Sequence, residues 1–154
     1  MTCRTFLLIF ILCVLFLHTL PAQRNCEFPI ATGPSGQRSP AVYGDIVVWT
    51  DERNHNQDIY GYNLKMQEEF QVTTNVDNQY QPAIYEDIVV YTDSRNGNSD
   101  IYGYDLETGR EFQITTDHSQ WDPAIYEDVV VDLMRGMDLM MSMDVISQQE
   151  RSFL

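Results

Sequence analysis

The residues of this sequence whose types and spacing could do chemistry are acidic and amide side chains gathered in two loops. Calcium binds six to eight oxygen atoms of this kind. Each group also contains an arginine, Arg53 or Arg95, and the spacing differs from that of a known calcium-binding loop. We therefore expect the Asp and Asn side chains to cap turns while each arginine pairs with an aspartate. The two groups are Asp51, Asn54, Asn56 and Asp58, and Asp93, Asn96, Asn98 and Asp100.

The histidines and serines form no catalytic pattern. None of His18, His55 and His118 recurs at an equivalent position or has a Cys or His neighbour at metal-ligand spacing. The sequence has no Gly-x-Ser-x-Gly turn, and nothing marks one pair of its many carboxylates as the acid and base of a glycosidase. We therefore predict that the chain is not an enzyme and has no catalytic, cofactor-binding or metal-binding residue.

Aromatic residues are numerous, and they suggest two uses. Their rings could stack on sugars, or they could pack between structural units. Because most of them recur at fixed positions of a repeat, we favour packing. They are Tyr43, Trp49, Tyr60, Tyr62, Tyr80, Tyr85, Tyr91, Tyr102, Tyr104, Trp121 and Tyr126.

The repeat that positions all these residues occupies most of the chain. Residues 40–74 and 82–116 are copies of one another at an offset of 42 residues, and a third copy opens at Pro123, 41 residues further on. The third copy matches through Val131 only. Internal repetition at this period is typical of solenoids and propellers.

Each full copy predicts four short antiparallel strands. In the second copy, residues 88–92 are β-branched or aromatic without alternation, which suits a strand covered on both faces. Residues 100–105 and 111–115 alternate in type, as strands do. Pro82 must lie at the start or edge of a strand because it donates no ladder hydrogen bond. Four such strands form one blade of a β-propeller, which is stabilised by stacking on like blades.

The two copies differ at the hairpin between their third and fourth strands. Gly109 occupies the left-handed position of this turn in the second copy, whereas the first copy has Gln67 there. A residue other than glycine at positive φ costs on the order of 1 kcal/mol. Either this hairpin changes its turn type, or the first copy is locally strained.

Residues 27–32 resemble a fourth strand whose own blade is absent. Glu27 lies 13 residues before Pro40, as Glu69 lies 13 residues before Pro82. Such a strand would join the last blade and close the ring. We therefore predict an all-β, incomplete β-propeller with two full four-stranded blades (40–81 and 82–122), one partial blade (123–131) and an N-terminal closing strand. Closed rings have four to eight blades.

Residues 132–154 do not continue the repeat. Five of the seven methionines lie here, and we hypothesise that this tail is a frameshifted remnant of further repeats. A weaker alternative is a helix with an apolar side. That side would comprise Leu133, Met134, Met137, Met140 and Met141.

The first 22 residues have the pattern of a secretory signal peptide: Arg4, then an apolar run over residues 6–17, then Ala22. An uncleaved anchor is the alternative, although the run is shorter than the roughly 20 residues that span a bilayer. Cys26 is the only cysteine after the leader. It therefore has no disulfide partner in the mature chain, and its flanking residues do not favour a lipid anchor.

Acidic residues outnumber basic ones 23 to 9, giving a formal net charge of −14. Phosphate backbones and anionic membranes should be repelled. We therefore predict no nucleic-acid partner and no membrane contact beyond the signal peptide. The leader predicts an extracytoplasmic location. The incomplete ring predicts association through open blade faces with a protein partner or another copy.

The repeat resembles the TolB-type propeller repeat of exported bacterial proteins and archaeal cell-surface proteins. The likeness covers residues 27–131 and is carried by residues 49–51, 53–54, 58–60 and 70–73 of the first copy and 91–93, 95–97, 100–102 and 112–115 of the second. Such propellers serve as protein-docking platforms and as parts of peptidases and lyases. The resemblance thus implies a noncatalytic interaction or structural module. The alternatives are a fragment of a propeller-containing hydrolase or lyase, or a nonfunctional truncated product.

Overall fold

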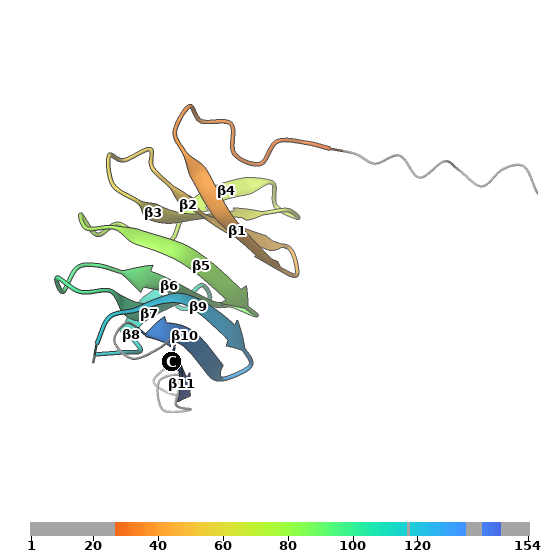
Figure 1. Cartoon of the computed structure of the whole chain (residues 1–154). Coiled ribbons are helices and arrows are strands. Elements are labelled where there is room, and N and C mark those ends of the chain that lie inside the picture. The colour runs from red at the N-terminus through yellow and green to blue at the C-terminus, as the bar shows by residue number, and fades with distance from the viewer. Residues whose placement is uncertain (1–26, 117, 135–139, 146–154) are drawn as a thin grey trace, which may run out of the picture.

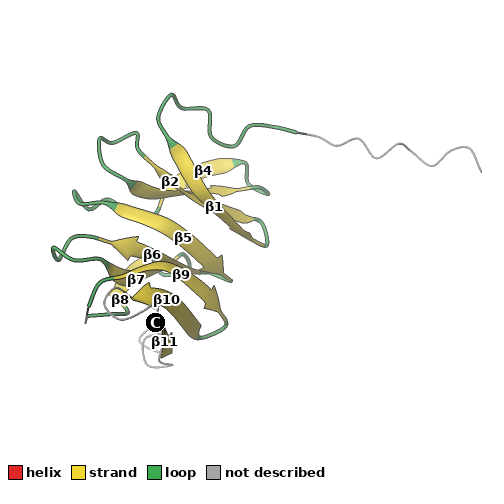
Figure 2. Cartoon of the chain, viewed as in Figure 1, coloured by secondary structure: helices red, strands yellow, loops and turns green. Residues whose placement is uncertain are grey.

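The computed structural model describes residues 27–116, 118–134 and 140–145, and within them it contains strands and loops but no helix (Figure 2). Among these residues no helix is long and apolar enough to cross a bilayer. The predicted signal peptide (residues 1–22, which include His18) and Cys26 lie outside the described residues. The strands are β1 (Gln37–Tyr43), β2 (Ile46–Asp51), β3 (Asp58–Asn63), β4 (Glu68–Gln71), β5 (Gln79–Tyr85), β6 (Ile88–Asp93), β7 (Asp100–Asp105), β8 (Arg110–Gln113), β9 (Gln120–Tyr126), β10 (Val129–Met134) and β11 (Met140–Val145).

The strands form three antiparallel sheets that follow one another along the chain. Their orders are β1-β2-β3-β4, β5-β6-β7-β8 and β9-β10-β11. Figure 1 shows the sheets as successive layers, and the first strand of each later sheet packs on the sheet before it. We call the sheets blades 1, 2 and 3. The prediction of two four-stranded blades and one partial blade is confirmed.

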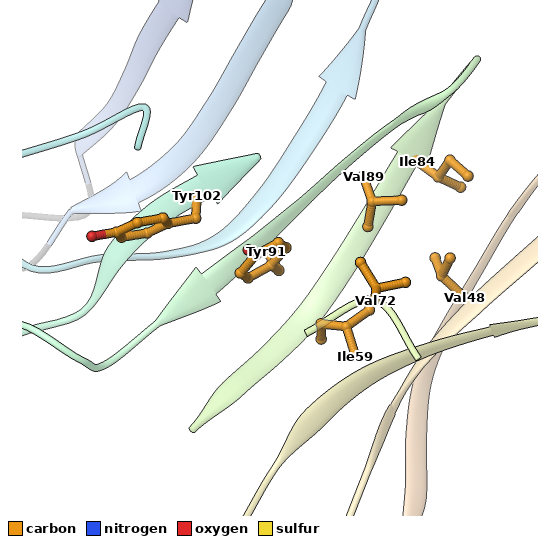
Figure 3. Close-up of a cluster of buried hydrophobic side chains, with 7 residues drawn as sticks. All are labelled: Val48, Ile59, Val72, Ile84, Val89, Tyr91 and Tyr102. Atoms are coloured by element: carbon orange, nitrogen blue, oxygen red, sulfur yellow. The ribbon is translucent and has the colours of Figure 1, made fainter. Parts of the chain in front are cut away.

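Apolar side chains fill the space between blades because the central strands present alternate residues to opposite faces. In β6, Val89 belongs to the cluster between blades 1 and 2, whereas Val90 belongs to the cluster between blades 2 and 3. Figure 3 shows the first cluster. Its buried members are Val48, Ile59, Val72, Ile84, Val89, Tyr91 and Tyr102.

The first strand of each blade starts three residues earlier than its proline. In β5, Pro82 lies at a register shift between Tyr80 and Ala83, and Gln81 has φ 55°. The same shift occurs in β1 and in the pairing of β9 with β10. Of the two predicted places for Pro82, the start or the edge of a strand, the structure shows the edge. Both β5 and its equivalents are edge strands, where a bulge accommodates the missing N–H.

A glycine in the third strand of blades 1 and 2 lies under an aromatic ring of the fourth strand. A Cβ at Gly103 would come within 2.4 Å of Phe112 Cζ, and one at Gly61 equally close to Phe70 Cζ. These pairs directly oppose each other in the ladders. Glycine is therefore required here by the ring that covers it.

The hairpin after the third strand keeps the same turn in both full blades. Gln67 has φ 58° and Gly109 has φ 71°. In both, the N–H of that residue donates to the carbonyl oxygen four residues back, Asn63 O at 2.8 Å and Asp105 O at 2.9 Å. Of the two predicted outcomes, local strain in the first copy is the one found.

Residues 27–32 form no strand, so that part of the prediction was wrong for the isolated chain. A strand needs a neighbouring ladder, and no third strand of a preceding blade lies beside this segment among the described residues. Phe28, the equivalent of Phe70, is 57% exposed.

Strand structure continues beyond residue 131, where the repeat match ends. β10 extends to Met134 and pairs with β11, so Leu133, Met134, Met140 and Met141 lie in strands and the helix alternative was wrong at these positions. β11 pairs with β10 as β3 pairs with β2 in blade 1, so it takes the third-strand position of blade 3 although its sequence does not match the repeat. Residues 135–139 and 146–154 lie outside the described residues.

Candidate interaction surfaces

Each predicted loop group is built around a buried aspartate at the end of the second strand. Asp93 is fully buried, and Arg95 donates to it from Nη2 at 2.6 Å and from its backbone N–H at 2.8 Å. Arg95 also donates to both carboxylate oxygens of Glu111, at 2.6 and 2.8 Å. Its guanidinium lies 4.3 Å from the centre of the Tyr102 ring, a cation–π contact.

Blade 1 repeats the arrangement. Arg53 pairs with buried Asp51 at 2.7 Å and with Glu69, and it lies 4.1 Å from the centre of the Tyr60 ring. Trp49 Nε1 donates to Asp51 at 3.0 Å. The prediction that each arginine pairs with an aspartate is confirmed.

These contacts fix the charge states of the cluster. Burial opposes ionisation of Asp51, but hydrogen bonds from Arg53 and Trp49 together hold its pKa well below the usual range. The bond to Asp51 raises the pKa of Arg53. Burial and the bond to Glu111 raise the pKa of Tyr91. All three groups thus keep one protonation state near neutral pH, which suits a structural role and not proton transfer.

The asparagines of each group present N–H donors to the carboxylates. Asn96 Nδ2 donates to Asp100 at 2.8 Å and to the Tyr102 hydroxyl at 3.1 Å. Asn98 Nδ2 donates to Asp100 at 2.8 Å and to the His118 carbonyl at 2.9 Å. Donor nitrogens, not further oxygens, therefore converge on the acids. Among the described residues, no three His, Cys, Asp or Glu side chains are grouped as a metal would require.

The two described histidines lie in turns. His55 and His118 are exposed and have φ of 74° and 65°. Neither histidine lines the pocket at Trp49 or the pocket at Tyr104.

A threonine next to each buried aspartate links neighbouring blades, which the sequence analysis missed. Thr50 Oγ1 accepts the N–H of Gln81 at 3.1 Å, and Thr92 Oγ1 accepts that of Asp122 at 3.2 Å. The donors are the bulged residues that precede proline. The sequence did contain a sign of these links, because a threonine recurs at the same position of an otherwise apolar strand in both copies. Blade 3 has Leu133 at this position, as the ladder with Trp121 shows.

Packing between blades is confirmed for Tyr91 and Tyr102, which belong to the apolar cluster between blades 1 and 2. It is also confirmed for Tyr43, Tyr85 and Tyr126, whose ring centres lie 4.9 and 5.2 Å apart across the three blades, although Tyr43 and Tyr126 remain 39% and 65% exposed. Trp49 and Tyr60 are buried as well, but their rings stack on each other within blade 1, with centres 6.5 Å apart.

The first face of blade 1 is built like a blade interface but has no blade against it. Val42 occupies the position of Ile84, yet it is 64% exposed where Ile84 is 8% exposed. Ile30, the equivalent of Val72, lies against the same face and lines an apolar pocket. This pocket is lined by Ile30, Ala31, Gln37, Arg38, Pro40, Val47 and Trp49. We call this face of blade 1, which carries Val42, Val47 and Trp49, the open face.

The stacked antiparallel sheets, joined by threonine links and interblade apolar clusters, are blades of a β-propeller. Solved structures show which propellers the chain is similar to. It matches TolB from Agrobacterium tumefaciens at 17% identity with a TM-score of 0.61, covering 71% of this chain and 45% of that one. TolB from Acinetobacter baumannii matches at 18% identity and a TM-score of 0.59, covering 70% and 29%.

The propeller domain of the trilobed protease from Pyrococcus furiosus matches at 18% identity and a TM-score of 0.53, covering 64% of this chain and 33% of that one. At these identities the likeness establishes the fold, which is that of part of a TolB-like β-propeller. The chain spans less than half the length of either TolB structure. No protein-family model and no curated protein matches the sequence.

Proposed function

We propose that the chain is a noncatalytic interaction module that acts outside the cytoplasm and docks, through its open face, on a further propeller blade. That blade belongs to another copy of the chain or to a protein partner. The observation that carries the proposal is the open face itself, where Val42 remains exposed although its equivalent in blade 2 is buried.

The occupant is a blade because the chain shows twice what such a face binds. Between blades 1 and 2, the face containing Ile84, Val89 and Tyr91 packs on Val48, Ile59 and Val72. The open face presents Val42, Val47 and Trp49 at the corresponding positions. Burial of apolar surface contributes roughly 25 cal/mol per Å². A further blade docked on the open face would therefore stabilise blade 1 in the way that blade 1 stabilises blade 2.

Phe28 supports the same occupant. Its equivalents Phe70 and Phe112 cover Gly61 and Gly103, whereas Phe28 is 57% exposed. The docked blade would supply a third strand with a glycine under the Phe28 ring. Residues 27–32 could then pair with that strand as its fourth strand.

The location rests on the leader pattern of residues 1–22, with its basic start and apolar run. Noncatalytic action rests on the loop clusters, whose acids and arginines are paired with one another.

Size-exclusion chromatography with light scattering on residues 23–154 tests the docking. We expect a discrete oligomer that Val42→Asp dissociates, because the substitution places an unpaired charge in an apolar interface. Val76→Asp is the matched control, since Val76 is 87% exposed in the loop before β5. A partner protein in place of a copy would leave the chain monomeric until that partner is added.

A folded monomer that binds no propeller blade, or an oligomer that survives Val42→Asp, would overturn the proposal. Unfolded aggregate would instead favour the nonfunctional truncated product.

The second candidate is part of a propeller-containing hydrolase or lyase whose catalytic part lies elsewhere. Similarity to the propeller domain of a protease favours it. Sequencing the surrounding locus tests this candidate, and an adjoining hydrolase domain in frame would support it over the docking module.

A further inference from the structure

Three tyrosines, Tyr43, Tyr85 and Tyr126, lie in contact across the three blades. They are the last residues of β1, β5 and β9, the first strands of their blades, and these strands lie side by side (Figure 1). The Tyr43 and Tyr85 ring centres are 4.9 Å apart, and those of Tyr85 and Tyr126 are 5.2 Å apart. Both distances are typical of aromatic rings in contact. We call these three residues the tyrosine ladder, and Tyr85 is the member shared by its two contacts.

The tyrosine ladder is accessible from solvent. Tyr43 and Tyr126 are 39% and 65% exposed. The rings of Tyr91 and Tyr102 also lie close together, with centres 6.4 Å apart, but these residues are 0% and 7% exposed. The hydroxyl group of Tyr91 is in addition held by a hydrogen bond to Glu111 at 2.6 Å. A soluble reagent therefore reaches the tyrosine ladder and not this buried pair.

Two exposed phenol rings in contact can be joined covalently without any catalytic residue of the chain. A one-electron oxidant, such as a peroxidase acting with hydrogen peroxide, removes one hydrogen atom from each of two tyrosine hydroxyls. The two phenoxyl radicals then form a carbon–carbon bond between ring positions next to the hydroxyl-bearing carbons. The hydrogens displaced from these positions move to the oxygens and restore both phenols. The product, dityrosine, has lost two hydrogen atoms in all, and one hydrogen peroxide is reduced to two water molecules.

The stacking of the blades favours this coupling within one molecule. Two groups held in contact react at a far higher effective concentration than the same groups on separate molecules. The planes of the two ring pairs meet at 48° and 61°. Exposed side chains reorient within nanoseconds, so these angles do not keep the reacting ring carbons apart.

A covalent link between blades would replace what the chain cannot make from cysteine. Cys26 is the only cysteine after the predicted leader, so the mature sequence has no internal disulfide. We propose that the tyrosine ladder is a site of oxidative modification, at which Tyr85 forms a dityrosine bond with Tyr43 or Tyr126 and joins adjacent blades. A cross-link of this kind stabilises a fold mainly by restricting the unfolded chain. The inference is independent of docking at the open face.

Peroxidase and hydrogen peroxide, applied to a dilute solution of residues 23–154, test the proposal. We expect dityrosine fluorescence in the single-chain band of a denaturing gel and a mass loss of two hydrogen atoms. Mass spectrometry of a digest should find a branched peptide that links Tyr85 to Tyr43 or Tyr126. Methionine oxidation adds oxygen instead and is distinguished by mass. The cross-linked chain should also unfold at a higher urea concentration than the untreated chain.

Variants show whether the tyrosine ladder directs the coupling. Tyr85→Phe should lower the dityrosine yield about tenfold or more, because it removes the phenol shared by both contacts and leaves no pair held together. Tyr62→Phe, which removes a tyrosine of β3 outside the tyrosine ladder, should match the parent. The parent treated in urea should behave like Tyr85→Phe. Circular dichroism checks that both variants are folded.

Absence of dityrosine from the treated parent would overturn the inference. So would an equal yield in Tyr85→Phe or in the unfolded parent, because the folded arrangement of the rings would then not direct the reaction. Bonds found only between separate chains would overturn it as well, since the link would not join blades of one molecule.

Discussion

At the scale of the residue, the loop groups show how a carboxylate is kept in a β core. Asp51 and Asp93 are fully buried, and each has an arginine that is itself held by a glutamate and a tyrosine ring. Breaking a buried pair from one side leaves an uncompensated charge, which is strongly destabilising. The cluster therefore joins the second, third and fourth strands of a blade through side chains.

Stability should fall in acid because of Asp51. Its folded-state pKa lies well below the ordinary 3.8: burial works against ionisation, but the hydrogen bonds from Arg53 and Trp49 outweigh it. The unfolded chain then takes up a proton first, so the stabilisation is complete above about pH 5 and is lost progressively below about pH 4. Urea unfolding from neutral pH to about pH 3 measures this loss.

Asp51→Asn should lower the free energy of unfolding at neutral pH, and it should also reduce the further loss of stability between neutral pH and about pH 3. Asp77→Asn, at an exposed position, serves as the control. An unchanged slope in Asp51→Asn would contradict the assignment of the acid loss to this residue.

The β3–β4 hairpin should be improved by glycine. Gln67→Gly is expected to stabilise the chain by several tenths of a kcal/mol up to about 1 kcal/mol, because Gln67 has φ 58°. The converse change, Gly109→Ala, should destabilise by a similar amount, and the nearest atom to its new Cβ is 3.6 Å away, so backbone strain is isolated from collision. Denaturant unfolding of both variants measures the effect, and opposite signs are required.

The pairing of Arg53 and Arg95 with aspartates could be predicted because all partners lie within one loop and recur in both copies. The threonine links could not. Thr50 and Gln81 are 31 residues apart and meet only when two blades stack. The exposure of Tyr43 and Tyr126 was missed for the same reason, since repetition places equivalent residues in register but does not show how much solvent reaches each of them.

At the scale of the element, the third and fourth strands of a blade are fitted to each other. The ring of Phe112 occupies the space that a side chain at position 103 would need, and Phe70 does so over Gly61. This explains why the third strand tolerates glycine, which otherwise weakens a strand.

Gly103→Ala should destabilise the chain by about 1–3 kcal/mol, because the new Cβ collides with the ring. In a Phe112→Leu background the same change should cost less, and the difference between the two costs measures the coupling. Thermal and denaturant unfolding of the four variants of this cycle supply the numbers. Equal costs in both backgrounds would show that backbone freedom, not the ring, requires glycine.

Most strand positions followed from composition, but strand starts did not. The proline lies at the bulge and is not the first residue of β1, β5 or β9, because the two residues that precede the bulge still pair with the neighbouring strand. The strand expected over residues 27–32 failed for a different reason. Its sequence suits a strand, but hydrogen-bond partners from another strand decide whether one forms.

At the scale of the whole molecule, blade 2 is the only described blade with another blade on each side. Its central residues Val89, Val90 and Tyr91 are completely buried, and they divide between two apolar clusters. In stacked repeats, stability is approximately the sum of each unit and its interfaces. Blade 2 therefore gains from two interfaces where blades 1 and 3 gain from one.

Hydrogen–deuterium exchange should be slowest in β6 and β7. Local opening of a blade with two interfaces requires the most free energy, so amides of residues 88–93 and 100–105 should exchange more slowly than those of β2 and β3. Mass spectrometry of peptic fragments, corrected against the unfolded chain, measures this. Equal protection in blades 1 and 2 would mean that the open face is covered in solution, which oligomer formation would also produce.

The bulge before each proline has a consequence for unwanted assembly. Sheet edges are templates on which a foreign chain can extend the ladder, and proline, bulges and very short strands all blunt them. β1, β5 and β9 have the proline and the bulge, and β4 and β8 have four residues each. Among the described edges, β11 alone has six residues with neither device. Fibrillar growth of this chain, where it occurs, should therefore begin at blade 3 and leave blades 1 and 2 intact.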